Sequence, residues 1–189
     1  MADEIPQTLD SKRVFEGRVF RVRVDELRYA DGATHRCDVV EHEGTFGIIP
    51  LLRSGEIVLV RQYRHPVGRV LWEIPAGTSE AGEPAAEGAL RELAEETGFR
   101  AGSIRPLWSV YMTPGFCDEA MHFFVAEDLR EGSQSLDEDE RIEVGRFTLA
   151  RAFDLFERGE IADVKTLLAL QWLAAQRGEL TTGTVDRKN

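Results

Sequence analysis

The sequence predicts one α+β domain with a small antiparallel sheet at its N-terminus. Apolar and polar residues alternate between Val14 and His42, a pattern typical of half-buried strands. Longer apolar runs follow and indicate buried strands, and two segments near the C-terminus have the spacing of amphipathic helices. Strands with a helix between them and helices after them predict an α+β fold. With 189 residues, the chain is long enough to fold around a hydrophobic core without disulfide bonds or a structural metal ion.

The N-terminal region, residues 1–43, is expected to hold two or three strands after a loose lead-in of residues 1–12. Asp31-Gly32 marks the turn of a hairpin, because this pair readily adopts the positive φ angles that tight turns need. A second hairpin is expected from residues 48–52 and 57–63. Its strands are continuously apolar, so it is expected to be more buried than the first.

Residues 44–178 are expected to form the main domain, followed by a flexible tail of residues 179–189. A helix is predicted from Pro84 to Thr97, because five apolar residues form a stripe and Gly98 suits a C-terminal cap. The later predicted elements are strands at residues 109–112, 121–126 and 141–149, and helices at residues 153–158 and 163–176.

The composition narrows the range of partners. Lys and Arg number 23 against 34 Asp and Glu, giving a net charge of −11. Nucleic acid and anionic membranes are therefore not expected as partners, and a phosphate ligand would need a local source of positive charge such as a metal ion. The N-terminus has no apolar signal-peptide segment, which predicts a cytoplasmic protein. Cys37 and Cys117 have no metal-like spacing and are expected as thiols.

The predicted helix at residues 84–97 carries three carboxylates on one face, those of Glu92, Glu95 and Glu96. Like charges so placed destabilise a helix unless a cation lies between them. Oxygen ligands without nearby Cys or His suit a hard cation, so the pattern predicts a Mg²⁺ or Mn²⁺ site. Arg91, four residues before Glu95, is placed to hold that carboxylate.

The spacing around this helix is more specific than its charge. Five residues separate Gly77 from Glu83, and seven more precede Arg91-Glu92-Leu93-Ala94-Glu95-Glu96-Thr97-Gly98-Phe99. These residues resemble the Nudix box, the signature of hydrolases that act on nucleoside diphosphates linked to another group. The resemblance implies an α/β/α sandwich around a mixed sheet, and it runs from about Gly44 to Gln176.

The segments flanking the box resemble those of the ADP-ribose pyrophosphatase branch of this family. They are Arg61-Gln62-Tyr63-Arg64, Leu71-Trp72-Glu73-Ile74-Pro75-Ala76-Gly77, Thr113-Pro114-Gly115-Phe116-Cys117-Asp118-Glu119 and the acidic loop Asp137-Glu138-Asp139-Glu140. The implied reaction is hydrolysis of the pyrophosphate of ADP-ribose to AMP and ribose 5-phosphate. GDP-mannose or another nucleotide sugar is the alternative substrate, since the same segments occur in GDP-mannose hydrolases.

The resemblance also implies the residues of the site. The metal ligands would be Glu92 and Glu96, completed by Glu95, Glu140 and the carbonyl of Ala76, holding one to three Mg²⁺ ions, with Mn²⁺ as the alternative. Glu138 is the expected catalytic base, and Glu140 is the alternate base or a further ligand. A flexible acidic loop is suited to closing on bound substrate.

Substrate contacts are expected from Arg64, Glu73, Pro114, Phe116 and Asp118. A guanidinium at Arg64 can grip phosphate oxygens at two points. Glu73 either contacts substrate or orients a neighbour, and Trp72 is either core or a base-stacking residue. Some members of the branch sandwich adenine between aromatic residues of the N-terminal sheet, but Cys37 stands where one of them is expected. Base recognition is therefore not assigned.

The resemblance further implies a homodimer in which the N-terminal sheet of one subunit helps to build the site of the other. Two other functions compete with the nucleotide-sugar hydrolase. One is a non-catalytic ADP-ribose sensor, which the intact box glutamates disfavour. The other is a housekeeping nucleoside-triphosphate hydrolase, which the box alone does not distinguish but which would lack the N-terminal sheet.

Overall fold

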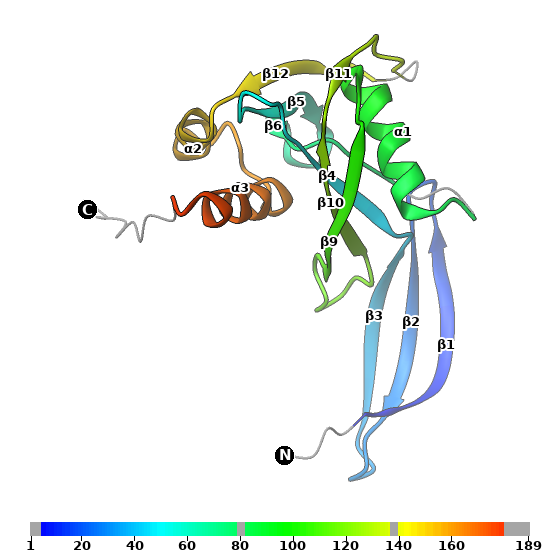
Figure 1. Cartoon of the computed structure of the whole chain (residues 1–189). Coiled ribbons are helices and arrows are strands. Elements are labelled where there is room, and N and C mark those ends of the chain that lie inside the picture. Colours follow the sequence, from blue (N-terminus) through cyan, green and yellow to red (C-terminus); the bar gives the residue numbers. More distant parts are fainter. Residues whose placement is uncertain (1–4, 79–81, 137–139, 180–189) are drawn as a thin grey trace.

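The computed structural model describes residues 5–78, 82–136 and 140–179. A four-stranded and a three-stranded sheet lie between helices, a two-stranded sheet adjoins them, and a three-stranded N-terminal sheet extends away (Figure 1). The strands are β1 Gln7–Glu16, β2 Phe20–Arg28, β3 Thr34–His42, β4 Thr45–Pro50, β5 Ile57–Arg64, β6 Arg69–Glu73, β7 Ala76–Thr78, β8 Phe99–Arg100, β9 Ser103–Tyr111, β10 Ala120–Glu127, β11 Arg130–Glu131 and β12 Glu143–Phe147. The helices are α1 Ala85–Thr97, α2 Leu149–Glu157 and α3 Val164–Arg177, with a short 3₁₀ turn, His65–Val67.

The N-terminal sheet has three antiparallel strands in the order β1-β2-β3. The predicted turn is confirmed, because Gly32 has a φ of +86° and its N–H donates to the carbonyl of Tyr29. The expected loose lead-in of residues 1–12 is wrong, since β1 begins at Gln7. Nearly every residue of β1 is exposed, so the strand carries no apolar face that the sequence pattern would reveal.

The second predicted hairpin is correct at its turn and wrong in its pairing. Leu52 and Glu56 close the turn, and Leu51 forms a bridge with Ile57. Beyond that point the strands separate into different sheets, β4 between β7 and β10 and β5 between β12 and β6. Each is the inner strand of a sheet with covered faces, which explains the buried apolar run in each. The parallel pairing of β10 with β4 makes the four-stranded sheet mixed.

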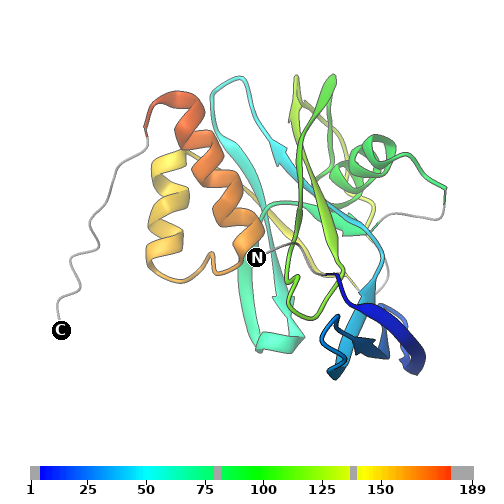
Figure 2. The ribbon, with the colours of Figure 1, turned by 90° about the horizontal axis from the view of Figure 1, so that it is seen from below.

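The helices cover opposite sides of the paired sheets, giving the expected α/β/α layers (Figures 1 and 2). On one side Ala89 and Leu93 of α1 pack against Phe46 and Phe124. On the other side α2 and α3 enclose the larger core, in which Trp72 is 8% exposed and meets Phe147 edge-on. Trp72 is therefore a core residue rather than a base-stacking one.

The predicted later elements are present with altered bounds. The strand expected at residues 109–112 begins at Ser103, and the helix expected at 153–158 begins at Leu149. The short strands β6, β7, β8 and β11 were not expected. β6 is an edge strand of one sheet, β7 is an edge strand of the other, and Ile74-Pro75 connects them. The chain therefore crosses from one sheet to the other just before the box segment, which begins at Gly77.

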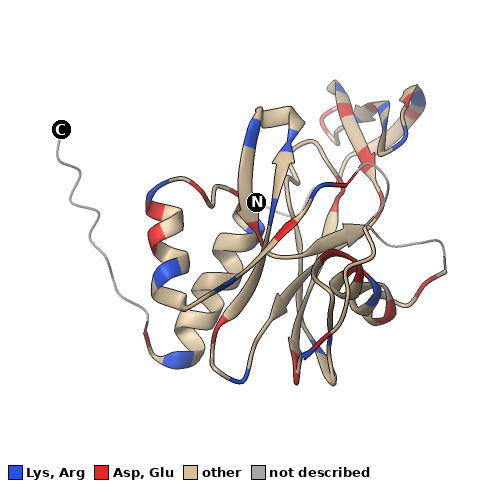
Figure 3. Cartoon of the chain, turned by 90° about the horizontal axis from the view of Figure 1, so that it is seen from above, with Lys and Arg blue, Asp and Glu red and all other residues tan. Residues whose placement is uncertain are grey.

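The distribution of charged residues and the state of the two cysteines agree with what the composition predicts. Lys and Arg are scattered along the ribbon among Asp and Glu rather than gathered in one block (Figure 3). Cys37 and Cys117 are free thiols, the second of them buried. Within the described ranges, no helix has both the length and the apolar character needed to cross a membrane.

One buried hydrogen bond fixes α3 against the segment between β6 and β7. The Ile74 N–H donates to Oγ1 of Thr166 at 2.9 Å, and Thr166 is fully buried. We expect Thr166→Val to lower the free energy of unfolding by about 1–3 kcal/mol, because it keeps the side chain's shape but leaves the N–H unsatisfied. Urea denaturation measures this, with the exposed Thr8→Val as control. Equal stability of the two variants would contradict it.

Candidate active site

Helix α1 presents its acidic face to the sheet edge because its apolar stripe fixes its rotation. Ala89 and Leu93 are fully buried, which holds the helix against the core. The helix begins after Pro84 and ends at Gly98, whose φ of +73° gives a left-handed cap as predicted. The three carboxylates on the acidic face then lie at graded depths, from Glu96 through Glu92 to the more exposed Glu95.

Glu96 is the most deeply buried of the three, with 3% of its surface exposed. Its Oε2 accepts a hydrogen bond from the N–H of Ala76 at 3.1 Å. Burial and the nearby charge of Glu92 raise the pKa of Glu96 to about 8, although the Ala76 hydrogen bond acts the other way. Burial also raises the pKa of Glu92. For Glu92 this burial outweighs the charge and hydrogen bond of Arg91, and for Glu96 it outweighs the charge of Arg64.

Arg91 binds two carboxylates of its own helix that are predicted metal ligands, those of Glu92 and Glu95. Its guanidinium binds Glu83 through two hydrogen bonds of 3.0 Å, and its Nη1 donates to Glu92 and Glu95 at 2.9 Å each. The predicted pairing with Glu95 is confirmed. These bonds, led by the one to Glu83, raise the pKa of Arg91 further. The arginine therefore ties the box glutamates to one another across the helix surface.

Gly77 lies where the chain passes closest to Glu92. A Cβ added to Gly77 would stand 2.0 Å from Cδ of Glu92, nearer than any two such atoms can approach. The strand β7 is held at this point by pairing of Gly77 with Phe46 of β4, and Phe46 is fully buried. A side chain at residue 77 would therefore displace the carboxylate rather than the strand.

The oxygen donors fit a hard divalent cation, but they do not enclose one in this arrangement. Within residues 5–78, 82–136 and 140–179, no three His, Cys, Asp or Glu side chains converge on one point. The reason is that Arg91 draws Glu92 and Glu95 aside and Ala76 binds Glu96. Glu140 lies near enough for its charge to raise the pKa values of Glu92 and Glu96. Glu138, the expected base, lies outside the described residues.

The raised pKa of Glu96 makes stability depend on pH in the metal-free protein. The unfolded chain releases this proton near its ordinary value of 4.5, whereas the folded chain holds it until about pH 8. Unfolding between these values releases a proton, so rising pH lowers the free energy of unfolding, by a few kcal/mol over the window. We expect urea denaturation in EDTA to show this decline and Glu96→Gln to flatten it. A wild-type profile as flat as the variant's would contradict the assignment.

Arg64 and Glu73 form a second charged cluster beside the box, together with a residue that sequence reasoning missed. Arg64 binds both oxygens of Glu73, at 2.9 and 2.7 Å, and Nζ of Lys165 lies 2.5 Å from one of them. Burial alone would raise the pKa of Glu73, but the hydrogen bonds from Arg64 and the charge of Lys165 outweigh it and lower that pKa. Glu73 is 1% exposed, so in this arrangement it orients two cations. Its predicted contact with substrate stays a prediction.

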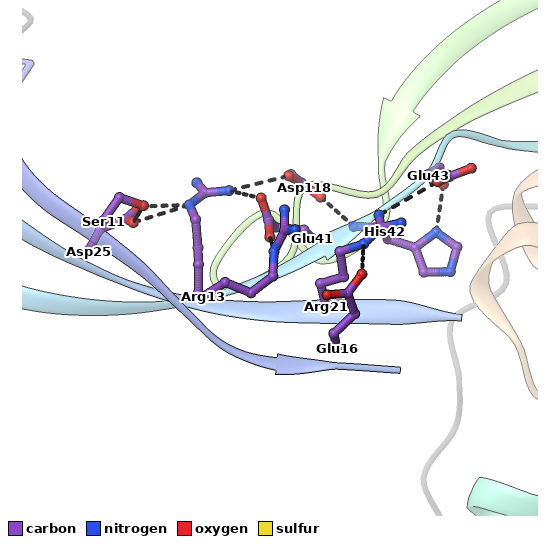
Figure 4. Close-up of polar contacts among 10 residues, drawn as sticks. Ser11, Arg13, Glu16, Arg21, Asp25, Glu41, His42, Glu43 and Asp118 are labelled. Atoms are coloured by element: carbon purple, nitrogen blue, oxygen red, sulfur yellow. Dashed lines mark hydrogen bonds and ion pairs between the residues drawn. The ribbon is translucent and has the colours of Figure 1, made fainter. Parts of the chain in front are cut away.

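The loop containing Pro114, Phe116 and Asp118 docks on the end of the N-terminal sheet. Val40 of β3 exchanges backbone hydrogen bonds with Phe116 and Asp118, and Oδ1 of Asp118 accepts the N–H of His42 at 2.8 Å (Figure 4). The three residues line a cavity of about 260 Å³ with Cys37 and Cys117. Phe116 is 58% exposed. The three residues predicted to contact substrate therefore lie together. No described residue of the box lines their cavity.

Two larger cavities share Thr78 of β7 in their linings. The first, about 610 Å³, includes Phe20, Tyr63, Thr78 and Glu140 in its lining. The second, about 310 Å³, is lined by Thr78 with Ala76, Gly77, Arg64 and Lys165 among others. Thr78 borders both cavities, so a ligand with two bulky ends joined by a short bridge could occupy them at once, with its bridge at the start of the box segment.

Comparison with known proteins supports the family resemblance of the box segment. The family model described as the NUDIX domain matches residues 41–170. The ADP-ribose pyrophosphatase of Bacillus subtilis (strain 168) is 38% identical, covering 88% of this chain and 91% of its own length. The methanol dehydrogenase activator of Bacillus methanolicus is 38% identical, covering 90% and 93%. A GDP-mannose pyrophosphatase of Klebsiella pneumoniae is 33% identical, covering 90% and 91%. A crystal structure titled as an ADP compounds hydrolase superposes with a TM-score of 0.81 at 26% identity, covering 93% of this chain and 97% of its own.

Proposed function

The chain belongs to the Nudix family, and from that premise we propose that it hydrolyses the pyrophosphate of a nucleoside-diphosphate sugar. ADP-ribose is the proposed substrate, with AMP and ribose 5-phosphate as products. The observation that carries the proposal is the pair of cavities sharing Thr78, since it gives a nucleoside and a sugar separate places with the pyrophosphate between them. The B. subtilis relative, named as an ADP-ribose pyrophosphatase, supports the choice of sugar nucleotide.

We propose Mg²⁺ as the cofactor, held by Glu92, Glu96, Glu95, Glu140 and the carbonyl of Ala76. A bound divalent cation supplies neutralisation of the phosphate oxygens and lowers the pKa of water. The buried Glu96 supports the assignment, because an ionised carboxylate at that depth needs a cation beside it. To bind the cation, Glu92 and Glu95 must turn away from Arg91. Arg91 then keeps its hydrogen bonds to Glu83.

The catalytic base is proposed to be Glu138, with Glu140 as the alternative. A base must accept a proton from the attacking water without itself being a central metal ligand. Glu140 borders the larger cavity and lies within electrostatic range of Glu92 and Glu96, which supports its membership of the site. Arg64 is proposed to bind a phosphate oxygen, since one of its nitrogens is not engaged with Glu73.

The proposed assembly is a homodimer in the cytoplasm. The N-terminal sheet supports an intermolecular contact, because Val14, Phe15, Val19 and Phe20 expose between 41% and 59% of their surface. Pro114, Phe116 and Asp118, docked on the same sheet, are proposed to contact substrate within the dimer. Light scattering coupled to size-exclusion chromatography tests the assembly, and a monomer at micromolar concentration would contradict it.

Product analysis with Mg²⁺ tests the activity across ADP-ribose, GDP-mannose, NADH, diadenosine polyphosphates and dGTP. We expect selective conversion of ADP-ribose to AMP and ribose 5-phosphate. Preference for GDP-mannose, the substrate named for the K. pneumoniae relative, would keep the reaction and replace the sugar. Tight binding of a nucleotide sugar without any turnover would replace the enzyme with a sensor. Preference for dGTP would indicate a nucleoside-triphosphate hydrolase.

A further inference from the structure

One arginine lies among three carboxylates where the N-terminal sheet meets the loop of residues 113–119. Arg23 of β2 donates from Nε to both oxygens of Asp25, at 3.2 and 3.0 Å, and from Nη1 to Oε1 of Glu41 at 3.1 Å. The same Nη1 lies 3.9 Å from Oδ2 of Asp118, which belongs to the loop. Figure 4 shows Asp25, Glu41 and Asp118 following one another from the sheet toward the loop. One guanidinium therefore links two strands of the sheet to a loop far along the chain.

The inner end of this cluster is a buried carboxylate. Asp25 is 6% exposed, and its Oδ1 accepts a hydrogen bond from Oγ of Ser11 at 2.6 Å. The hydrogen bonds from Ser11 and Arg23 lower the pKa of Asp25 although burial acts the other way, so the group is ionised at neutral pH. A buried charge that is bonded on two sides fixes the guanidinium beside it. Arg23 is therefore anchored on the sheet, with its Nη1 directed toward Glu41 and Asp118.

Asp118 attaches the loop to the sheet with both of its carboxylate oxygens. Its Oδ1 accepts the N–H of His42 at 2.8 Å, while its Oδ2 faces Arg23. Beside it the Asp118 N–H donates to the carbonyl of Val40, and the Val40 N–H donates to the carbonyl of Phe116. The Asp118 side chain is 47% exposed, so solvent competes for its carboxylate. Without Arg23 it would face the carboxylates of the sheet alone, and the repulsion between like charges would loosen the loop.

We propose that Arg23 is a positioning residue, which through Asp118 holds the loop of residues 113–119 in place for contact with substrate. This inference rests on the proposed function, in which Pro114 and Phe116 of this loop contact the nucleotide sugar. Phe116 is 58% exposed, so its place depends on the backbone bonds that Asp118 secures rather than on packing. A loop that is already ordered loses little entropy when a ligand binds, which strengthens binding.

Amide hydrogen exchange and steady-state kinetics together test this role. The variants are Arg23→Met, Arg23→Lys, which keeps the charge, and Arg13→Met. Arg13 of β1 is the matched control, because its Nε binds the same Glu41, at 3.2 Å, from the outer strand of the sheet. We expect Arg23→Met to speed amide exchange of residues 113–119 about tenfold and to raise KM for the preferred nucleotide sugar about five- to tenfold, with kcat within about twofold of the wild type. Arg23→Lys should restore part of both effects, and Arg13→Met should resemble the wild type.

The outcomes separate this inference from the proposed function. Absence of turnover of every nucleotide sugar by the wild type would defeat the proposed function, whereas exchange of residues 113–119 is measured without turnover and still decides whether Arg23 holds the loop. Unchanged exchange in Arg23→Met, or an equal effect of Arg13→Met, would overturn the positioning role. Faster exchange with an unchanged KM would overturn its importance for substrate. If Arg23→Met fails to fold, Arg23→Gln combined with Asp25→Asn replaces it, because this pair removes both buried charges together.

Discussion

Replacing Glu96 with Gln is expected to abolish at least about 99.9% of turnover while leaving the protein folded. The substitution keeps the size of the side chain and an oxygen for the hydrogen bond from Ala76 but removes the carboxylate that is proposed to bind the cation. Loss of one central ligand of a catalytic cation withdraws several kcal/mol of transition-state stabilisation, and about 4 kcal/mol corresponds to a thousandfold in rate. Steady-state kinetics with the preferred nucleotide sugar measures the loss.

Glu95→Gln is the matched control on the same helix. The Glu95 side chain is 39% exposed and paired with Arg91, so a smaller loss is expected than at Glu96. Calorimetric titration with Mn²⁺ adds a readout that does not depend on turnover, and the affinity of Glu96→Gln should fall together with its rate. A Glu96→Gln variant with more than a tenth of wild-type activity would remove Glu96 from the metal site.

The acidic helix was predictable because the signals that define it are local. Its apolar residues recur at helical spacing, Gly98 supplies the left-handed cap, and the pairing of Arg91 with Glu95 spans one turn. The order of elements and the apolar runs of β4 and β5 indicated an α+β fold, and the resemblance to the Nudix family implied its layers. Such features depend on neighbours within a few residues, and the sequence displays those directly.

Other parts of the molecule depend on contacts that no local pattern records. Strand β1 is exposed along nearly its whole length and is defined by its pairing with β2. The separation of β4 from β5 depends on partners that arrive later in the chain. Lys165 reaches Glu73 across 92 residues, and although the segment Gly159-Glu160-Ile161 before its helix resembles the branch, the lysine itself was not predicted. It is the second residue of α3, whose N-cap is Asp163, and this position brings it to the sheet.

The same distinction applies to the metal ligands. The spacing of Glu92, Glu95 and Glu96 predicts a shared helix face, and the structure has it. It does not predict that Arg91 would engage two of the three, because the arginine's reach to Glu83 depends on the path of the preceding segment. Arg91 thus neutralises two carboxylates that are proposed to bind a divalent ion.

Gly77→Ala is expected to lower turnover about 100-fold through Glu92. The added Cβ would stand 2.0 Å from Cδ and 2.3 Å from Oε1 of Glu92, while β7 cannot retreat because it is paired with the fully buried Phe46. The carboxylate must therefore swing out of place. A misplaced group in a catalytic constellation costs on the order of 100-fold. Steady-state kinetics and a thermal melt measure the effect, which should fall on the rate with little change in stability.

A double-mutant cycle shows whether the effect passes through Glu92. In a Glu92→Gln background the ligand charge is already lost, so adding Gly77→Ala should lower turnover by less than about threefold. If instead the two losses multiply, Gly77→Ala disturbs something other than Glu92, such as the path of Ala76 past Glu96. Because Gly77 opens the box segment and Glu92 lies fifteen residues later, coupling between them would mean that the glycine serves close approach of strand and helix.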